Sequence, residues 1–346
     1  MQALVKYASG PEKVEIRDVP APQPTSANVI IDVAAVAICG TDRLAVEGVH
    51  DFDVPRTLGH EASGTVRHIG EGSGRPDLSI GDRVTVETDS YLCMECEYCR
   101  TGQYNRCPRR LGIGTTTDGA LAEQLTIPGR AVHVLPPNVS LLEGALTEPL
   151  AVAVHAVIEQ SESIAGRVVV VIGPGAVGQL CAQVAHAVGA TVVLIGRSRH
   201  SESLKKARES GMAHTIDSET EDVKAVIDRL TDGYGAHTVY ECSGATGILA
   251  DAIPLLRRGG RIVLVAFFRE HPQVDFDAVI NRELVILGSR GKRPSSYRTA
   301  LQLMAEGRVD VGSLIQARLP LSQWQVGLDQ VALGKKVVFE LAGDVT

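Results

Sequence analysis

Four of the seven cysteines lie close together in the sequence, spaced as Cys93-x2-Cys96-x2-Cys99-x7-Cys107. A short loop with four thiolates suits Zn²⁺, which prefers a tetrahedral shell of soft ligands, and a shell closed in this way predicts a structural rather than a catalytic zinc. Reduced free thiols and an iron–sulfur cluster, which also uses short cysteine spacings, are the alternatives. In a cytosolic chain, an odd number of crowded cysteines favours a metal over disulfides.

A second set of metal-ligand side chains is spread over the first part of the chain and comprises Cys39, His60, Glu61 and Glu148. Thiolate, imidazole and carboxylate ligands together form an open zinc shell, which water or a substrate completes. Such a shell is typical of a catalytic zinc. Single residues of these types are more often ordinary core or surface residues, so their spacing alone leaves both interpretations open.

A glycine-rich turn indicates a nucleotide site. Residues 168–172 are β-branched without alternation, as in a parallel strand that is covered on both faces. The pattern G-x-G-x-x-G follows and opens a helix, whose free N–H groups attract phosphate. A tight structural turn is the alternative, but this strand and helix context favours dinucleotide binding. The turn residues expected at the cofactor are Gly173, Gly175, Ala176, Val177 and Gly178.

The end of the next predicted strand bears on the choice of cofactor. Folds that prefer NAD keep an acidic residue about 20 positions after the glycine turn, where it binds the ribose 2′-hydroxyl. Here the sequence is Gly196-Arg197-Ser198-Arg199, without that acid. Two guanidinium groups and a hydroxyl suit the 2′-phosphate of NADP, so NADP is favoured and NAD stays possible. Solvated arginines at a helix start are the alternative.

The elements that must position these residues fall into two parts. The first part is mainly β, with strands expected at 3–7, 14–19, 28–36, 62–69 and 83–88. From residue 168 strands and helices alternate, with strands at 191–195, 237–241, 261–267 and 283–288 and helices at 201–210, 223–230 and 248–256. This rhythm predicts an α/β fold with a doubly wound parallel sheet. Helices at 295–306 and 321–333 and a strand at 337–341 are expected at the end.

Composition narrows the class of protein. Apolar residues make up 44% of the chain and charged residues 22%, as in a soluble globular protein. A formal net charge of −7, without any basic tract, argues against a nucleic-acid partner. No secretion signal and no apolar run of membrane length is visible, so we expect a cytoplasmic protein without a membrane partner.

Taken together, these motifs resemble the zinc-containing medium-chain alcohol and polyol dehydrogenases. In chain order the motifs are CGTD at 39–42, GHE at 59–61, GDRV at 81–84, the four cysteines, EPLAVAVHA at 148–156, GPGAVG at 173–178 and ECSG at 241–244. The resemblance implies a GroES-like β-rich catalytic domain over 1–150, with a structural-zinc lobe at about 89–110. It further implies a Rossmann dinucleotide-binding domain over 151–285 and a return to the catalytic domain over 286–346.

The resemblance also implies roles for single residues. Cys39 and His60 match two ligands of the catalytic zinc, and Glu148 matches the third. Glu61 matches a glutamate that binds the metal directly or exchanges with water. Thr41 matches the hydroxyl that hydrogen-bonds the substrate oxygen. The serine of the ECSG motif, Ser243, is expected at the cofactor.

One position departs from the family pattern. Many relatives have a histidine five residues after the first cysteine, at the outer end of a proton relay, and this chain has Leu44 there. A proton from Thr41 must therefore leave by a ribose hydroxyl, by water or by another side chain such as His50. A solvated loop histidine is the alternative for His50.

The expected function is hydride transfer between NAD(P) and a small-molecule alcohol or ketone, polar and secondary, such as a polyol or sugar derivative. The cofactors implied are two Zn²⁺ per chain, one catalytic and one structural, and NADP or NAD. The family also implies a homodimer or homotetramer. A zinc-independent quinone or enoyl reductase of the same superfamily and a non-enzymatic NADP-sensing protein are the alternatives.

Overall fold

The computed structural model describes residues 1–49, 53–268 and 270–341. The chain divides into two compact units. Unit 1 comprises Met1–Pro149, Arg293–Ala305 and the chain from Leu314 on, and unit 2 comprises Leu150–Lys292 and Glu306–Ser313. Each unit has its own hydrophobic core.

Unit 1 is built mainly of antiparallel strands. Its strands are β1 (Gln2–Lys6), β2 (Val14–Asp18), β3 (Asn28–Ala37), β4 (Arg56–Thr57), β5 (Glu61–Ile69), β6 (Arg83–Val86), β7 (Asp89–Tyr91), β8 (Leu111–Gly112), β9 (Gln124–Pro128), β10 (Val132–Val134), β17 (Ile315–Pro320) and β18 (Lys336–Glu340). The largest sheet has the order β10-β6-β5-β3-β18-β17, and β9 also pairs with β3. Smaller sheets join β2-β1-β4 and β7-β8.

Strand β3 is central to unit 1 because its sequence, NVIIDVAAVA, is apolar and buried along nearly its whole length. It pairs with β5 over most of that length, with β9 near its start and with β18 near its end. Its side chains pack in a core with Leu121 and Phe339, and full burial of such a side chain stabilises the fold by about 1.5–3 kcal/mol. The end of β3 is thereby fixed between β5 and β18.

Short helices connect the strands of unit 1. They are α1 (Gly40–Val46), α2 (Glu97–Arg100), α3 (Leu141–Ala145), α4 (Thr147–Val154, which runs on into unit 2), α10 (Pro294–Ala305) and α11 (Trp324–Ala332), with 3₁₀ turns at Tyr104–Arg106, Gly129–Ala131 and Leu321–Gln323. A further 3₁₀ turn, Gly312–Leu314, begins in unit 2 and ends in unit 1. Helix α3 begins with a capping box, because Ser140 Oγ accepts the Glu143 N–H and the Glu143 carboxylate accepts the Ser140 N–H.

Unit 2 contains a six-stranded parallel sheet in the order β13-β12-β11-β14-β15-β16. The strands are β11 (Val168–Ile172), β12 (Thr191–Gly196), β13 (His214–Asp217), β14 (Ala236–Glu241), β15 (Leu256–Leu264) and β16 (Val285–Gly288). The chain starts at β11 in the middle, runs outward on one side and returns to the other through β14. The carboxyl ends of β11 and β14 therefore form a topological switch point, where ligands bind in such sheets.

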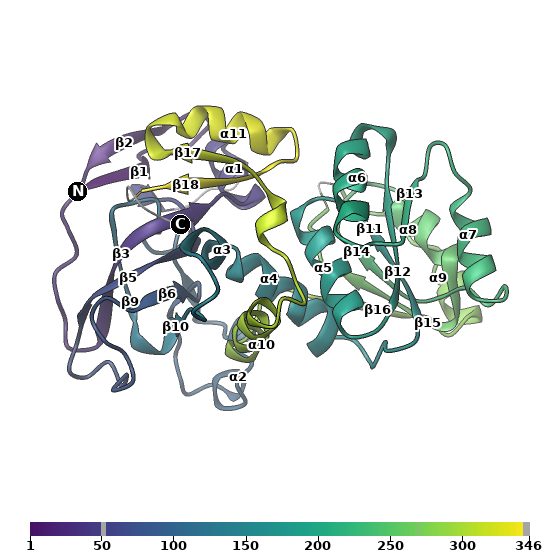
Figure 1. Ribbon diagram of the computed structural model, residues 1–346, viewed down its shortest axis with the longest axis horizontal. Coiled ribbons are helices and arrows are strands. Elements are labelled where there is room, and N and C mark those ends of the chain that lie inside the picture. The colour runs from purple at the N-terminus through teal and green to yellow at the C-terminus, as the bar shows by residue number, and fades with distance from the viewer. Residues whose placement is uncertain (50–52, 269, 342–346) are drawn as a thin grey trace. The chain divides into compact units, whose positions relative to one another are not determined.

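Helices cover both faces of this sheet, with α5 and α6 on one side and α7 and α9 on the other (Figure 1). The helices are α5 (Ala176–Ala187), α6 (Ser201–Glu209), α7 (Val223–Leu230), α8 (Ile248–Ala252) and α9 (Phe276–Asn281), with a π-helix at His155–Glu159 and 3₁₀ turns at Ser198–His200 and Ile253–Leu255. The predicted doubly wound α/β arrangement is confirmed.

Several elements escaped the sequence analysis, and three of them show why. Helix α1 has two poor helix formers, glycine and threonine, at its start, and it forms because tertiary contacts override that preference. Strand β13 has only four residues, too few for a clear alternation. Strand β17 ends in proline and has no fully buried side chain, so its sequence lacks a hydrophobic signal.

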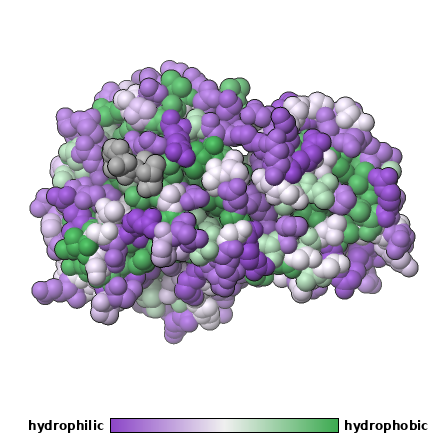
Figure 2. Space-filling model, in the orientation of Figure 1, coloured by the Kyte–Doolittle hydropathy of each residue, from purple (hydrophilic) through white to green (hydrophobic). Residues whose placement is uncertain are grey.

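The surface agrees with the composition. In Figure 2, hydrophilic residues cover most of the visible face, and apolar residues form separate patches. Across residues 1–49, 53–268 and 270–341, no helix combines the length and the apolar character needed to cross a membrane.

Candidate functional site

Two antiparallel strands bring the first candidate metal ligands together. Strand β3 pairs with β5 so that Ala37 lies opposite Glu61. Cys39, the N-cap of α1, lies two residues after Ala37, and His60 lies immediately before Glu61. The ligand atoms of Cys39, His60 and Glu61 lie within 4.8 Å of one another. We call these three residues the Cys39–His60–Glu61 group.

Asp42 connects the segments that carry these ligands. Its carboxylate accepts the Cys39 N–H at 2.9 Å and the Gly59 N–H at 3.2 Å. Its Oδ1 also lies 3.5 Å from His60 Nδ1, as an ion-pair partner rather than as a hydrogen-bond acceptor. Burial is the largest influence and opposes a charge on His60, but the Asp42 carboxylate and the Cys39 sulfur together outweigh it and raise the pKa of His60 to about 10. Burial likewise opposes the charge on Asp42, yet His60 and the two N–H donors lower its pKa.

Glu61 forms a buried ion pair with a residue from the far end of the chain. Lys336, the first residue of β18, directs Nζ to Glu61 Oε2 and to the Ile38 carbonyl oxygen, the latter at 3.0 Å. Glu61 is 1% exposed and Lys336 is 6% exposed. One carboxylate oxygen of Glu61 is therefore bound by a cation of the protein itself.

The other residues predicted for this site lie as follows. The Cys39 thiol points to Thr41 Oγ1 at 3.7 Å, in the first turn of α1. Glu148 is buried in the first turn of α4 and is not a member of the Cys39–His60–Glu61 group. The structure thus brings three of the four predicted ligands within the 4.8 Å limit and leaves Glu148 outside it. Leu44 lies further along α1, and His50 lies outside the described residues.

The four clustered cysteines form a second candidate metal group. Cys93 Sγ lies 3.8 Å from Cys99 Sγ and 3.6 Å from Cys107 Sγ. Four sulfurs at about 2.3 Å from one zinc lie about 3.8 Å apart, so this spacing fits a zinc–thiolate tetrahedron. N–H donors from Glu95 and Cys96 lower the pKa of Cys93 to about 6, whereas burial and the neighbouring thiols raise the pKa of Cys99 to about 12. Among the described residues all seven cysteines are free of disulfides.

The glycine turn in unit 2 has the close backbone contacts of a dinucleotide site. Gly173 has φ +100°, and a Cβ there would approach the backbone of Ser243 to 3.0 Å. A Cβ on Gly178 would collide with the Gly173 carbonyl oxygen. Both positions therefore require glycine. Gly175 is the N-cap of α5, whose first residues are Ala176 and Val177.

The loop after β14 is fixed against this turn. The buried Glu241 carboxylate accepts the Ser243 N–H at 2.7 Å, the Ser243 hydroxyl at 2.5 Å and the Gly244 N–H at 3.0 Å. Ser243 is thus held at the switch point, beside Gly173. The acidic residue at the end of β14 was not assigned a role from the sequence.

A cavity of about 760 Å³ opens in unit 2 beside this turn, and Gly173, Ser243, Arg197 and Arg199 line it. Ser198 is not among the lining residues. Its hydroxyl donates to Asp217 at 2.6 Å and its N–H donates to Glu219 at 3.0 Å. The Ser198 hydroxyl lowers the pKa of Asp217. Two carboxylates that the sequence analysis missed therefore hold the loop between the two arginines.

Two further functional residues were missed for different reasons. Asp42 carries a local signal, since an acidic residue three positions after a helix N-cap is the pattern of a capping box. Lys336 carries none, because only the pairing of β18 with β3 brings it to Glu61.

Unit 2 presents a dinucleotide turn at the switch point of a doubly wound sheet, and unit 1 presents an open thiolate, imidazole and carboxylate group. These are two features expected of a metal-binding, nucleotide-dependent dehydrogenase. Residues 25–137 match the family model described as alcohol dehydrogenase GroES-like domain, and residues 176–306 match the model described as zinc-binding dehydrogenase.

Individual relatives extend this result over nearly the whole chain. The chain is 38% identical to sorbitol dehydrogenase of Halalkalibacterium halodurans, covering 97% of this chain and 98% of the relative. It is 34% identical to D-arabitol-phosphate dehydrogenase of Enterococcus avium, covering 97% of this chain and 96% of the relative. The crystal structure of a Sinorhizobium meliloti 1021 protein bound to NADP superposes on this chain with a TM-score of 0.86 at 28% identity. The superposition covers 98% of this chain and 99% of the other.

The chain belongs to the zinc-type medium-chain alcohol and polyol dehydrogenase family. The predicted family and the predicted fold, a GroES-like domain with a Rossmann domain, are confirmed, as is the expectation of an alcohol or polyol dehydrogenase. The matched family model is described as a zinc-binding dehydrogenase and the Sinorhizobium meliloti structure holds NADP, so the chemistry of both candidate sites agrees with these relatives.

Proposed function

We propose that this chain is a zinc-dependent oxidoreductase that moves a hydride between NAD(P), with NADP favoured, and a polar secondary alcohol or its ketone. The observation that carries the proposal is the approach of the Cys39, His60 and Glu61 ligand atoms to within 4.8 Å. Two relatives are named for a polyol and for a polyol phosphate, which supports polyols and sugar derivatives as the substrate class.

The donor atoms of the Cys39–His60–Glu61 group suit a catalytic zinc. The thiolate and the imidazole are soft and borderline ligands, and Asp42 orients the ring as carboxylates do behind metal-binding histidines. Lys336 already binds one oxygen of Glu61, which suits Glu61 to the exchangeable role. Glu148 lies outside the 4.8 Å group and keeps the third-ligand role only as what the family resemblance implies. When bound, zinc acidifies a hydroxyl at its open position and polarises a carbonyl there.

Thr41 is the residue we assign to the proton. Its hydroxyl lies 3.7 Å from Cys39 Sγ, which puts an oxygen that both donates and accepts at the edge of the ligand group. The leucine at position 44 has no proton to exchange, so the Thr41 proton passes to water, to a ribose hydroxyl of the cofactor or to another side chain. Thr41 therefore holds the substrate hydroxyl and receives its proton.

We assign a second, structural zinc to Cys93, Cys96, Cys99 and Cys107. Four thiolates leave no position for a substrate, so this ion stabilises the lobe and takes no part in turnover. The expected content is two zinc ions per chain.

Arg197 and Arg199 are the residues we assign to the 2′-phosphate of NADP. Both line the cavity of unit 2, and a guanidinium group suits a phosphate through paired N–H donors. The Ser198 hydroxyl is bound to Asp217, so its part is to hold the loop. Asp217 and Glu219 place negative charge near this position and limit the preference for NADP over NAD.

We also propose that the chain assembles as a homodimer or homotetramer. Strand β16 is the outer strand of the unit 2 sheet, and an unpaired strand edge is a template for pairing with a second chain. Val285 on this strand is 38% exposed, and Phe276 and Ile280 of the preceding helix are 65% and 72% exposed. Light scattering at several concentrations measures the assembly, and Val285→Lys is expected to reduce it.

A substrate screen tests the proposed reaction. Purified protein is assayed with NADP and with NAD against polyols, polyol phosphates, simple secondary alcohols, quinones and enoyl substrates. Oxidation of a polyol or polyol phosphate that stops on zinc removal and returns with zinc supports the proposal. Reduction of a quinone or enoyl substrate that survives complete zinc removal would establish the zinc-independent alternative.

A further inference from the structure

Residues 57–59, which directly precede His60, form backbone hydrogen bonds with residues 119–121, about sixty positions later in the sequence. Three successive carbonyl oxygens before His60 accept backbone N–H groups from this segment. The donor–acceptor pairs are Gly119–Thr57, Ala120–Gly59 and Leu121–Leu58, each at 2.9 Å. On its N–H side, Gly59 is bound by Asp42. The main chain at the metal ligand is therefore fixed by hydrogen bonds from two directions.

Two glycines bring the backbone of this segment directly against Gly59. A Cβ on Gly114 would lie 2.5 Å from the Gly59 carbonyl oxygen and 2.8 Å from its carbon. A Cβ on Gly119 would meet the carbonyl oxygens of both Gly59 and Leu58. Backbone cannot yield as a flexible side chain can, so a side chain at either position must displace Gly59. Because His60 is the next residue, the metal ligand would move with it.

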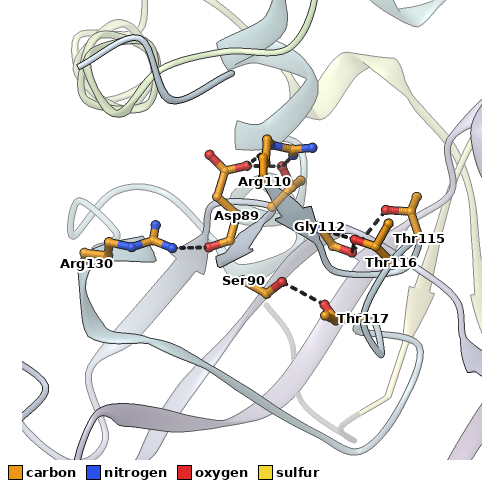
Figure 3. A network of polar contacts seen from close by, with 9 residues as sticks. Asp89, Ser90, Arg110, Gly112, Thr115, Thr116, Thr117 and Arg130 are labelled. Atoms are coloured by element: carbon orange, nitrogen blue, oxygen red, sulfur yellow. Dashed lines mark hydrogen bonds and ion pairs between the residues drawn. The ribbon is translucent and has the colours of Figure 1, made fainter. Parts of the chain in front are cut away.

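The same segment is tied to the four-cysteine lobe, the residues 92–110 between β7 and β8. The chain enters the lobe from β7 and leaves it into β8, and we call these two strands the legs of the lobe. Asp89 on β7 lies opposite Gly112 on β8. Arg110 spans the legs, because its guanidinium binds the Asp89 carboxylate and donates to Thr88 Oγ1 at 2.7 Å. Arg130 donates to the Asp89 carbonyl oxygen at 2.8 Å (Figure 3).

Residues 112–119, which we call the 112–119 turn, form hydrogen bonds within the turn and with β7. The Gly112 N–H donates to Thr116 Oγ1 at 2.7 Å, and the Gly112 carbonyl oxygen accepts the N–H groups of Thr116 and Thr117 at 3.0 Å. Thr117 also donates to Ser90 Oγ at 2.8 Å (Figure 3). Hydrogen bonds and short stretches of chain thus connect the base of the lobe, through this turn and the adjoining Ala120, to the peptide of Gly59.

We propose that the 112–119 turn positions His60, and that through it the four-cysteine lobe supports the metal affinity of the Cys39–His60–Glu61 group. Gly114 and Gly119 are the positioning residues. This inference rests on the proposed function in one respect, because it requires Cys39 and His60 to bind a metal. Both positions are then glycine for a geometric reason. Without a side chain, each lets the backbone of the turn lie directly against Gly59, and this sets the distance between the turn and His60.

Two alanine variants with a matched control test the contact. Gly114 has φ +71° and Gly74 has φ +70°, so an alanine meets the same backbone strain at both, but nothing lies within 4 Å of a Cβ on Gly74. The variants are Gly114→Ala, Gly119→Ala and the control Gly74→Ala. Each full-length protein is stripped of metal and titrated with Co²⁺, and Cys39→Ser supplies the reference spectrum for the four-cysteine site alone.

The proposal predicts that Gly114→Ala and Gly119→Ala lower the affinity of the Cys39 site for Co²⁺ by about tenfold or more, because a metal ligand loses the support behind it. The affinity is read from the Cys39-dependent part of the cobalt absorption. The four-cysteine absorption and Gly74→Ala should match the wild type. Wild-type affinity in folded Gly114→Ala and Gly119→Ala protein would overturn the coupling alone. Absence of a Cys39-dependent signal in the wild type would overturn both the proposed function and the coupling.

A gentler variant covers the case in which both alanine proteins fail to fold. Arg110→Met removes the guanidinium between the legs of the lobe and leaves Gly59 untouched. Weaker cobalt binding at the Cys39 site in this variant, with the four-cysteine site filled, supports the coupling. Unchanged binding there overturns it.

Discussion

Lys336 Nζ lies against Glu61 Oε2, although the two residues are 275 positions apart in the sequence. The contact exists because β18 pairs with the end of β3, where β5 also begins. A second Lys336 bond, to the Ile38 carbonyl oxygen, fixes the ammonium group beside the residue that precedes Cys39. The last strand of unit 1 thus completes the surroundings of the candidate metal site.

Lys336→Met is expected to destabilise the protein by about 3 kcal/mol or more, because it leaves the Glu61 carboxylate buried without its cation. Chemical denaturation of the metal-free protein measures the change. In Lys336→Met/Glu61→Gln the charge is gone, so most of the loss should be recovered. An unfolding free energy equal to that of the wild type in the single variant would contradict this role.

Asp42→Asn is expected to lower zinc affinity at the Cys39 site by about 10–100-fold, since the ring of His60 loses the carboxylate that orients it. Competition with a chromogenic chelator measures the affinity. Asp77→Asn is the control, because Asp77 also forms an ion pair, with Arg75, but is exposed and lies on a different loop. Equal affinities in the two variants would argue against the role of Asp42.

Much of unit 2 could be predicted from the sequence because its signals are local. The apolar run before Gly173 forces a buried parallel strand, and the glycine spacing follows from contacts within one turn. The four cysteines are equally local, since they share one loop. Prediction failed where the signal lay elsewhere: the partners of Ser198 come from the end of β13 and the loop after it, and the β13 strand is too short to show a pattern.

The site of unit 1 could be predicted only in part, and mostly by resemblance. Cys39 and His60 are ordinary residue types, and nothing in their separation shows that β3 and β5 pair so as to join them. The register of two antiparallel strands is a long-range property. For the same reason Lys336 could not be found, and the contact of Gly114 with Gly59 depends on a turn whose path the sequence does not reveal.

Arg197→Ala is expected to lower kcat/KM with NADP by about tenfold or more and to change kcat/KM with NAD by much less. A charged hydrogen bond to a phosphate contributes about 1.5–3 kcal/mol, and 1.4 kcal/mol is a factor of ten. Asp217→Asn should shift the preference the opposite way, because it removes negative charge near the phosphate. Steady-state kinetics with both cofactors measure this, and an equal loss with NAD and NADP in Arg197→Ala would count against the assignment.

His237 is expected to make the protein less stable as the pH falls below about 6.5. Burial, followed by the guanidinium groups of Arg257, Arg167 and Arg261, lowers the pKa of His237. The unfolded chain therefore takes up a proton at higher pH than the folded chain, and unfolding is favoured on acidification. In His237→Asn the fall in melting temperature between pH 7 and pH 5 should be smaller. An identical fall in both proteins would contradict the effect.

The most direct test of the central claim, that Cys39 and His60 hold the metal at which the alcohol reacts, is the zinc content and turnover of Cys39→Ser beside the wild type. We predict two zinc ions per chain in the wild type, one in Cys39→Ser, no measurable polyol oxidation by the variant, and unchanged NAD(P) binding by fluorescence titration. Two zinc ions and wild-type turnover in Cys39→Ser would contradict the account.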